Sequence, residues 1–306
     1  GFFQKSGGGL KMKQLKPNFF IIGAPKCGTT SLSVYLSEHQ EIVMSHPKEP
    51  HYFSTDIENG RMTDQSKYLA CFAQDKTPIA VGDASTLYLY SKDAIQNILE
   101  FNPKAKLIVM LRNPTEVAFS FHQLALKIFS ETETNFEKAW YLQTERAIGN
   151  HVPKGCPDFK LLLYGEIAKF GFQVDRLLSK VNRHKVHFIY FDDFINKTDK
   201  IIQNVFNFLE LTPNLQIDYQ IHNKTKRIKY PQFTKMVNIA LGVKKSLGIK
   251  STFGIADRIH NKNITDETPK QLSSSTLRVL ADYFENDIQT LSNLLNKDFS
   301  KWNLNK

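Results

Sequence analysis

Residues 18–36 have the pattern of a phosphate-binding loop. An apolar run predicts a short buried strand over Phe19–Ile22, a loop lies between Gly23 and Gly28, and apolar periodicity predicts a helix from Thr29 onward. The backbone N–H groups of such a loop and of the first helical turn converge on one anion. The order strand, glycine loop, helix therefore predicts a site for a phosphate group.

The spacing of the two loop glycines matches the first half of the phosphate loop of nucleotide hydrolases. That motif continues with a lysine and a Mg²⁺-binding hydroxyl, whereas here Thr29 follows the second glycine and Lys26 is the lysine of the loop. The strand predicted over 106–111 ends in Arg112 and not in metal-binding acidic residues. The pattern therefore disfavours Mg-ATP. A plain strand-to-helix turn that needs glycine for its positive φ is the alternative.

An acid and an imidazole follow this loop in the segment His46–Phe53. Pro50 disfavours the helical region for Glu49 and predicts an extended backbone. Residues two apart share a face in an extended segment, so Glu49 and His51 are expected to point the same way. They could then serve as an acid/base pair. The alternative, which spacing alone favours, is a surface turn with ordinary charged residues.

A third polar element follows the clearest buried strand, Lys106–Leu111. Asn113 is a good N-cap and Pro114 a good first helical residue, so a helix is predicted to begin here, with Ser120 well inside it. Arg112 lies at the end of the strand. A guanidinium fork matches phosphate geometry. An arginine that merely caps the strand edge is the alternative.

These three segments, in this order, resemble the sulfotransferases that use 3′-phosphoadenosine 5′-phosphosulfate (PAPS). Pro25–Thr30 resembles their 5′-phosphosulfate loop, and Lys48–Phe53 resembles the segment that carries the catalytic carboxylate in the glycan-type enzymes. Leu111–Ser120 resembles their 3′-phosphate-binding element. The resemblance implies an α/β fold: a single domain with a central parallel sheet of four to five strands flanked by helices and a P-loop-like nucleotide site.

The resemblance also implies roles for individual residues. Glu49 is expected to be the general base, with His51 assisting or replacing it, and Lys26 is expected to stabilise charge on the donor. The residues expected to bind PAPS are Lys26, Cys27, Gly28, Thr29, Thr30, Ser31, Arg112 and Ser120. The residues expected to bind the acceptor are Lys92, Asp83 and His51. No metal site is expected.

The implied reaction transfers the sulfuryl group of PAPS to a hydroxyl or amine and releases 3′,5′-bisphosphoadenosine (PAP). A small-molecule acceptor, such as a natural product, is the preferred prediction, and a carbohydrate acceptor is the alternative. A P-loop kinase or a nucleotide-binding module is the alternative of another class. The kinase alternative lacks the lysine after the second glycine and the aspartate that would bind the metal ion. A nucleic-acid-binding module would explain the positive charge but leaves the ordered motifs unexplained.

Composition agrees with one globular α/β domain. The chain has 306 residues, 41% of them apolar, and a net charge of +10, which suits an anionic partner or serves solubility alone. No aromatic and basic signature of an RNA-binding domain is present, so no nucleic-acid partner is expected. Three cysteines make no disulfide framework, and no apolar run is long enough to span a membrane; both favour a cytoplasmic location. Residues 1–16 are expected to be a tag remnant or tail, and 17–306 the sulfotransferase domain.

The remaining segments are expected to complete the α/β pattern. Residues 130–157 are predicted to form a mobile loop or lid, and His222–Arg227 is a basic cluster that could contact the nucleotide or the acceptor. Further strands are predicted over Ile79–Ala84 and Val186–Phe191. Further helices are predicted over Asp93–Phe101, Phe159–Leu178, Ile201–Leu209 and Pro269–Leu295.

Overall fold

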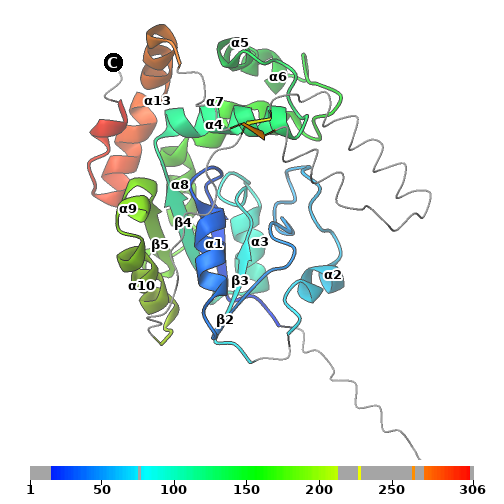
Figure 1. The fold of residues 1–306 in the computed structure, drawn as a ribbon, viewed down its shortest axis with the longest axis vertical. Coiled ribbons are helices and arrows are strands. Elements are labelled where there is room, and N and C mark those ends of the chain that lie inside the picture. The colour runs from blue at the N-terminus through cyan, green and yellow to red at the C-terminus, as the bar shows by residue number, and fades with distance from the viewer. Residues whose placement is uncertain (1–14, 75–76, 213–226, 229–263, 266–271, 304–306) are drawn as a thin grey trace, which may run out of the picture. The chain divides into compact units, whose positions relative to one another are not determined.

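The computed structural model describes residues 15–74, 77–212, 227–228, 264–265 and 272–303 (Figure 1). The chain divides into two compact units, one of residues 1–220 with 274–306 and the other of residues 221–273. In the second unit, β6 (Arg227–Ile228) pairs antiparallel with β7 (Ile264–Thr265). The predicted tail lies mostly outside the described residues, as does most of the basic cluster His222–Arg227.

The first unit is built on a parallel sheet of five strands in the order β2-β3-β1-β4-β5. These strands are β1 (Phe19–Gly23), β2 (Ile42–Met44), β3 (Ala80–Ala84), β4 (Lys106–Leu111) and β5 (Val186–Tyr190). Every residue of β1 is buried, as expected for the central strand of a sheet covered on both faces. The chain winds away from β1 in both directions. The carboxyl ends of β1 and its neighbours therefore border the crevice where such sheets bind ligands.

Helices cover both faces of the sheet. Right-handed crossovers place α1 on one face and α3 on the other, while α10 packs against α1 and α13 packs against α8 and α4 (Figure 1). The helices are α1 (Thr29–Ser37), α2 (Gln65–Ala70), α3 (Ala94–Phe101), α4 (Pro114–Lys127), α5 (Phe136–Tyr141), α6 (Gln143–Ala147), α7 (Tyr164–Ala168), α8 (Phe170–Leu178), α9 (Phe191–Asn196), α10 (Thr198–Leu209) and α13 (Ser274–Leu295).

The predicted α/β fold is confirmed, and two of the finer predictions are wrong. The segment 130–157 carries two helices, α5 and α6, and its Glu131 and Arg146 form a fully buried ion pair, so it is packed structure and not an open loop. The single helix predicted over Phe159–Leu178 is broken into a 3₁₀ turn, α7 and α8. The breaks fall at Leu163 and Lys169, whose ψ angles of 71° and 79° are not helical.

Within the part of the chain that the structure describes, no helix is both long enough and apolar enough to cross a membrane.

Candidate active site

The loop between β1 and α1 needs glycine at both of its ends. Gly28 has a φ of +89°, and a Cβ there would lie 3.3 Å from the ring of Phe191. Gly23 has a φ of +152°, and a Cβ there would lie 2.9 Å from the carbonyl oxygen of Thr86. Any other residue would be strained at either position. The two glycines therefore fix the close approach of this loop to β3 and β5.

The helix α1 presents its N-terminus at the end of this loop. Its N-cap is Gly28, which has no side chain to accept a hydrogen bond from the first-turn N–H groups. The positive end of the helix dipole favours an anion there. Thr29 is buried, Ser31 is half-buried and Thr30 is exposed on this turn. The structure thus places the loop residues of the predicted donor site around one helix terminus.

Cys27 differs from its loop neighbours because its side chain is turned into the core. It is completely buried, and its thiol lies 3.5 Å from the carbonyl oxygen of Pro25. Burial raises the pKa of this thiol far above its ordinary value. Cys27 can therefore serve a bound anion only through its backbone N–H group.

Lys26 and Arg112 come together at the edge of the loop. Nη1 of Arg112 donates a hydrogen bond of 3.3 Å to the carbonyl oxygen of Lys26, and its guanidinium lies 4.4 Å from the ring centroid of Phe191. Burial, followed by the positive charges of Arg112 and Lys127, lowers the pKa of Lys26. Repulsion among these cations is relieved when an anion binds between them.

The guanidinium of Arg112 is also paired with Glu116 on α4. Nε lies 2.7 Å and Nη2 lies 2.6 Å from the same carboxylate oxygen of Glu116. Ser120 is one helical turn further along, so Glu116 and Ser120 share a face of α4. The two residues predicted to hold a 3′-phosphate, Arg112 and Ser120, are therefore on the same side, with Glu116 between them in sequence.

Glu49 and His51 lie together, as predicted, but not because the segment is extended. Both residues have a positive φ, 61° for Glu49 and 50° for His51, which is the left-handed region of the backbone and not an extended conformation. Nε2 of His51 lies 3.5 Å from one carboxylate oxygen of Glu49, and Nζ of Lys48 lies 2.6 Å from the other. Burial alone would raise the pKa of Glu49, but its bond to His51 and the charge of Lys48 outweigh burial and lower the pKa to about 2.

Asp83 has a different place from the one predicted for it. It is completely buried at the end of β3, and its carboxylate accepts hydrogen bonds from Ser85 (2.7 Å), Tyr68 (2.9 Å) and Tyr88 (2.8 Å). Burial raises the pKa of this carboxyl group. A side chain with no exposed surface and three hydrogen bonds does not contact an acceptor.

The hydrogen bonds of Asp83 instead lead to the segment that carries Glu49 and His51. The hydroxyl of Ser85 donates to Asp83 and accepts a bond of 3.0 Å from the backbone N–H of His51. Asp83 is therefore a buried support for the Glu49–His51 segment, through Ser85. Sequence reasoning missed Ser85, although a polar residue directly after a core strand is a signal for this edge of the sheet.

Lys92 is exposed in the turn before α3. Its backbone N–H donates a hydrogen bond of 3.0 Å to Asp56, which places this turn beside the loop that follows Phe53.

Lys127, like Ser85, was not predicted from the sequence as a site residue. It lies in the last turn of α4, and its charge reaches Lys26.

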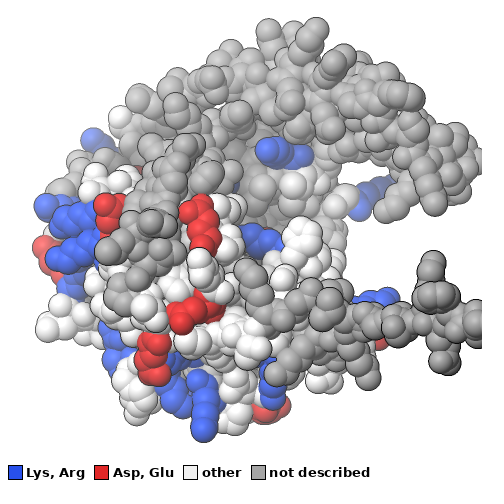
Figure 2. Space-filling model, turned by 60° about the horizontal axis from the view of Figure 1, so that its bottom comes forward, with Lys and Arg blue, Asp and Glu red and all other residues white. Residues whose placement is uncertain are grey.

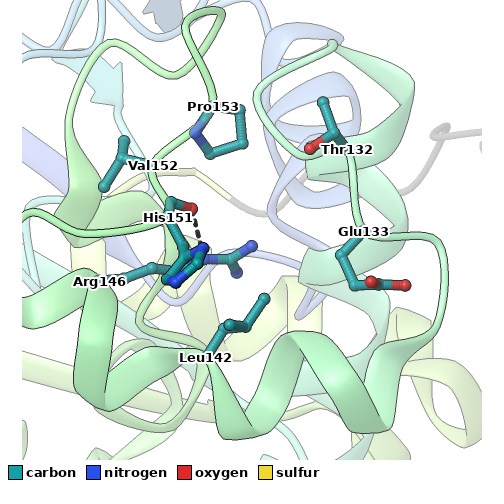
Figure 3. A pocket seen from close by; sticks show the side chains of 7 residues that line it. All are labelled: Thr132, Glu133, Leu142, Arg146, His151, Val152 and Pro153. Atoms are coloured by element: carbon teal, nitrogen blue, oxygen red, sulfur yellow. Dashed lines mark hydrogen bonds between the residues drawn. The ribbon is translucent and has the colours of Figure 1, made fainter.

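A hollow of about 340 Å³ lies elsewhere in the first unit, beside α6 (Figure 3). Arg146 lines it, but its guanidinium is bonded to Glu131 and its Nε donates to the carbonyl oxygen of His151 at 3.3 Å. The remaining lining residues are Thr132, Glu133, Leu142, His151, Val152 and Pro153. No residue of the predicted site lines this hollow.

Charged side chains of both signs are interspersed on the face shown in Figure 2. The net charge of +10 therefore does not form one continuous basic patch on the described part of this face. In the described ranges, no three His, Cys, Asp or Glu side chains gather in a group that could hold a metal ion.

The site combines a parallel α/β sheet, a glycine loop at its central strand and the cations Lys26 and Arg112 at that loop, which is the class of α/β fold that binds an anion at the carboxyl ends of its strands. Residues 16–253 match the model of the sulfotransferase domain family. The chain belongs to this family.

Among curated proteins, the chain is 30% identical over 111 residues to the membrane-associated sulfotransferase kil1 of Dictyostelium discoideum, covering 36% of this chain and 23% of that protein. It is 31% identical over 148 residues to mouse carbohydrate sulfotransferase 15, covering 34% of this chain and 26% of that protein. The matched part thus spans about a quarter of the length of each relative.

Solved structures share the fold. A sulfotransferase from Alicyclobacillus acidocaldarius aligns with a TM-score of 0.70 and 24% identity, over 94% of this chain and 99% of that chain. Mouse sulfotransferase SULT7A1, solved in complex with PAP, aligns with a TM-score of 0.50 and 13% identity, over 91% of this chain and 86% of that chain.

Proposed function

We propose that this protein transfers the sulfuryl group of PAPS to a hydroxyl or amine of an acceptor. One relationship carries the proposal: the Arg112 guanidinium donates a hydrogen bond to the carbonyl oxygen of Lys26, and the charge of Glu49 also acts on the Lys26 ammonium group. A lysine in an anion-binding loop, under the influence of a nearby carboxylate, can stabilise the charge that develops when a sulfuryl group is transferred.

The residues present fit PAPS as the donor. The 5′-phosphosulfate would lie at the N-terminus of α1, where Gly28 leaves the first-turn N–H groups without a side-chain cap. Arg112 and Ser120 would hold the 3′-phosphate and so select PAPS over ATP. This role requires Arg112 to share its guanidinium between the phosphate and Glu116, or to exchange one for the other.

The transfer itself forms one bond and breaks one. The acceptor oxygen or nitrogen attacks sulfur in line with the bridging oxygen of PAPS, and the bond from sulfur to that oxygen breaks. Glu49 takes the acceptor proton, with His51 assisting or replacing it. Lys26 and the loop N–H groups stabilise the negative charge that builds on the bridging oxygen and remains on PAP.

We propose a small-molecule acceptor for this transfer. A carbohydrate acceptor is the second candidate, and the name of carbohydrate sulfotransferase 15 favours it. A small glycoside satisfies both candidates, so it is the first class of acceptor to test.

Calorimetric binding of PAP, of 5′-AMP and of ATP with Mg²⁺ tests the donor site. Binding of PAP at micromolar or lower concentration, with a strong requirement for the 3′-phosphate, supports the proposal. A preference for Mg-ATP, or no binding of any of the three nucleotides, contradicts it and favours a kinase-like or purely structural loop.

A further inference from the structure

The loop that follows the proposed catalytic segment returns to it. The backbone N–H of Met62 donates a bond of 2.9 Å to the carbonyl oxygen of Pro50. Pro50 stands between Glu49 and His51 in the chain, and Arg61 directly precedes Met62. This hydrogen bond therefore closes residues 50–62 into a loop, and it holds the backbone of Arg61 beside the residues proposed to take the acceptor proton.

Several polar groups of the loop 50–62 form hydrogen bonds to neighbouring segments. Ile57, in the middle of the loop, is buried in the core with 1% of its surface exposed. The loop is therefore well ordered on the side that faces α3 and the turn before it. The bonds join the Thr55 hydroxyl to Asp93, the Asp56 carboxylate to Ser91 and Lys92, and the Glu58 N–H to Asp158.

Asn59 and Arg61 are the exceptions. Both amide atoms of Asn59 and Nε of Arg61 are inaccessible to solvent and form no hydrogen bond, and the same is true of Nδ1 of His51. In the described part of the chain these four atoms are the majority of the seven in this condition. Buried polar atoms without partners cost stability, so their gathering in one loop beside Glu49 calls for an explanation.

The chemistry of the two side chains indicates what would satisfy them. A guanidinium binds a carboxylate with two parallel hydrogen bonds. An asparagine amide both donates and accepts, and so it suits a hydroxyl group. Lys48 is already paired with Glu49, whereas Arg61 forms no ion pair with any described residue.

We propose that Arg61 and Asn59 recognise an acceptor that carries a carboxylate close to the hydroxyl that is sulfated, as in a uronic acid. Arg61 binds the carboxylate, and Asn59 binds a neighbouring hydroxyl. This inference rests on the proposed function and names the acceptor class for the same site.

The test compares two probes that differ only in the carboxylate, p-nitrophenyl β-D-glucuronide and p-nitrophenyl β-D-glucoside, with PAPS as donor. The wild-type protein is expected to show a kcat/KM at least about tenfold higher for the glucuronide, the effect of one good charge-assisted contact. Arg61→Gln should remove this preference through KM for the glucuronide, and leave the glucoside unchanged. Arg278→Gln, the same change at an exposed arginine of α13, is the matched control.

A second variant guards against a simple folding defect. Asn59→Asp puts a carboxylate beside Arg61, so it should abolish the glucuronide preference while the melting temperature and PAP affinity stay those of the control. Equal use of both probes by the wild type, no transfer to either, or an unchanged preference in Arg61→Gln overturns the inference. Calorimetric PAP binding is measured in every variant, so a failed donor site is distinguished from a wrong acceptor class.

Discussion

The ammonium group of Lys48 lies 2.6 Å from Oε1 of Glu49, the carboxylate that we propose as the general base. Nε2 of His51 lies 3.5 Å from the other oxygen, and together these contacts lower the pKa of Glu49 to about 2 against the opposing effect of burial. A carboxylate with so low a pKa is always ionised near neutral pH, but it is also a weak base. Lys48 thus keeps the Glu49 carboxylate ionised and also limits its strength as a base.

Replacement of Lys48 by Met should move the acidic limb of the pH–rate profile. The pKa of Glu49 rises when the ammonium is removed, so kcat/KM should begin to fall at a higher pH than in the wild type. Initial rates measured between about pH 3 and 8 report this shift, because the limb follows the protonation of the free enzyme's base. Lys67→Met, at an exposed lysine of α2, should leave the profile in place.

Replacement of Glu49 by Gln should separate binding from turnover. The amide keeps the size of the side chain but cannot take a proton, so turnover should fall by about 10²–10⁴-fold. PAP affinity, measured by calorimetry, should stay within about twofold of the wild type, a difference well below one ordinary hydrogen bond. Glu38→Gln, an exposed residue that follows α1, is the control. Undiminished turnover would transfer the role of base to His51.

Arg112 should contribute affinity that depends on the 3′-phosphate. Arg112→Ala removes charge-assisted hydrogen bonds, so PAP should bind about 10- to 100-fold more weakly, while the affinity for 5′-AMP should change little. Calorimetry with both nucleotides measures the difference. Arg278→Ala is the control, and an equal loss for PAP and 5′-AMP would mean that Arg112 acts only by holding the loop through Lys26.

Replacement of Ser85 by Ala should lower turnover without changing the affinity for the donor nucleotide. Ser85→Ala breaks the link between the Asp83 carboxylate and the His51 N–H, and it leaves both partners buried and short of a bond. We expect a loss of about 1–3 kcal/mol in the free energy of unfolding and a lower kcat. PAP affinity should be unchanged. Ser37→Ala, an exposed serine on α1, should have neither effect, and an unaltered kcat in Ser85→Ala would remove the proposed supporting role.

Local patterns predicted the elements that carry the site. The apolar runs gave β1 and β4, and the cap residues Asn113 and Pro114 gave the start of α4, because these signals depend on neighbours in sequence. The proximity of Glu49 to His51 was predicted, but from an extended backbone that the structure does not have. Both residues have a positive φ in the left-handed region.

The tertiary contacts were not accessible in the same way. Nothing local indicates that Asp83 would be completely buried under two tyrosine hydroxyls, because that burial depends on how α2 and the segment after β3 pack. The closure of the loop 50–62 through Met62 and Pro50 is likewise a contact across the fold. Single-sequence periodicity carries no information on such contacts.

The buried ion pair between Glu131 and Arg146 predicts the largest change in stability. The two side chains are 0% and 1% exposed and form two hydrogen bonds of 2.6 and 2.8 Å, and the hydroxyl of Tyr164 donates a third to Glu131. Burial alone would raise the pKa of Glu131, but these bonds outweigh it and lower the pKa. The stabilisation is therefore present above the unfolded-state pKa of about 4.3 and lost as the pH falls through the lower, folded-state value.

Glu131→Gln should leave the Arg146 charge buried without its counter-ion. Removing one partner of a buried pair costs about 3–5 kcal/mol, since the remaining charge keeps its desolvation penalty. Urea unfolding at pH 7 measures this loss, and the difference between the wild type and the variant should shrink as the pH is lowered, because Glu131 is then protonated in both unfolded and folded chains. Glu137→Gln, at an exposed residue of α5, should cost little at any pH. A wild-type stability for Glu131→Gln would mean that packing around α5 and α6, and not the ion pair, holds this segment against α4 and α7.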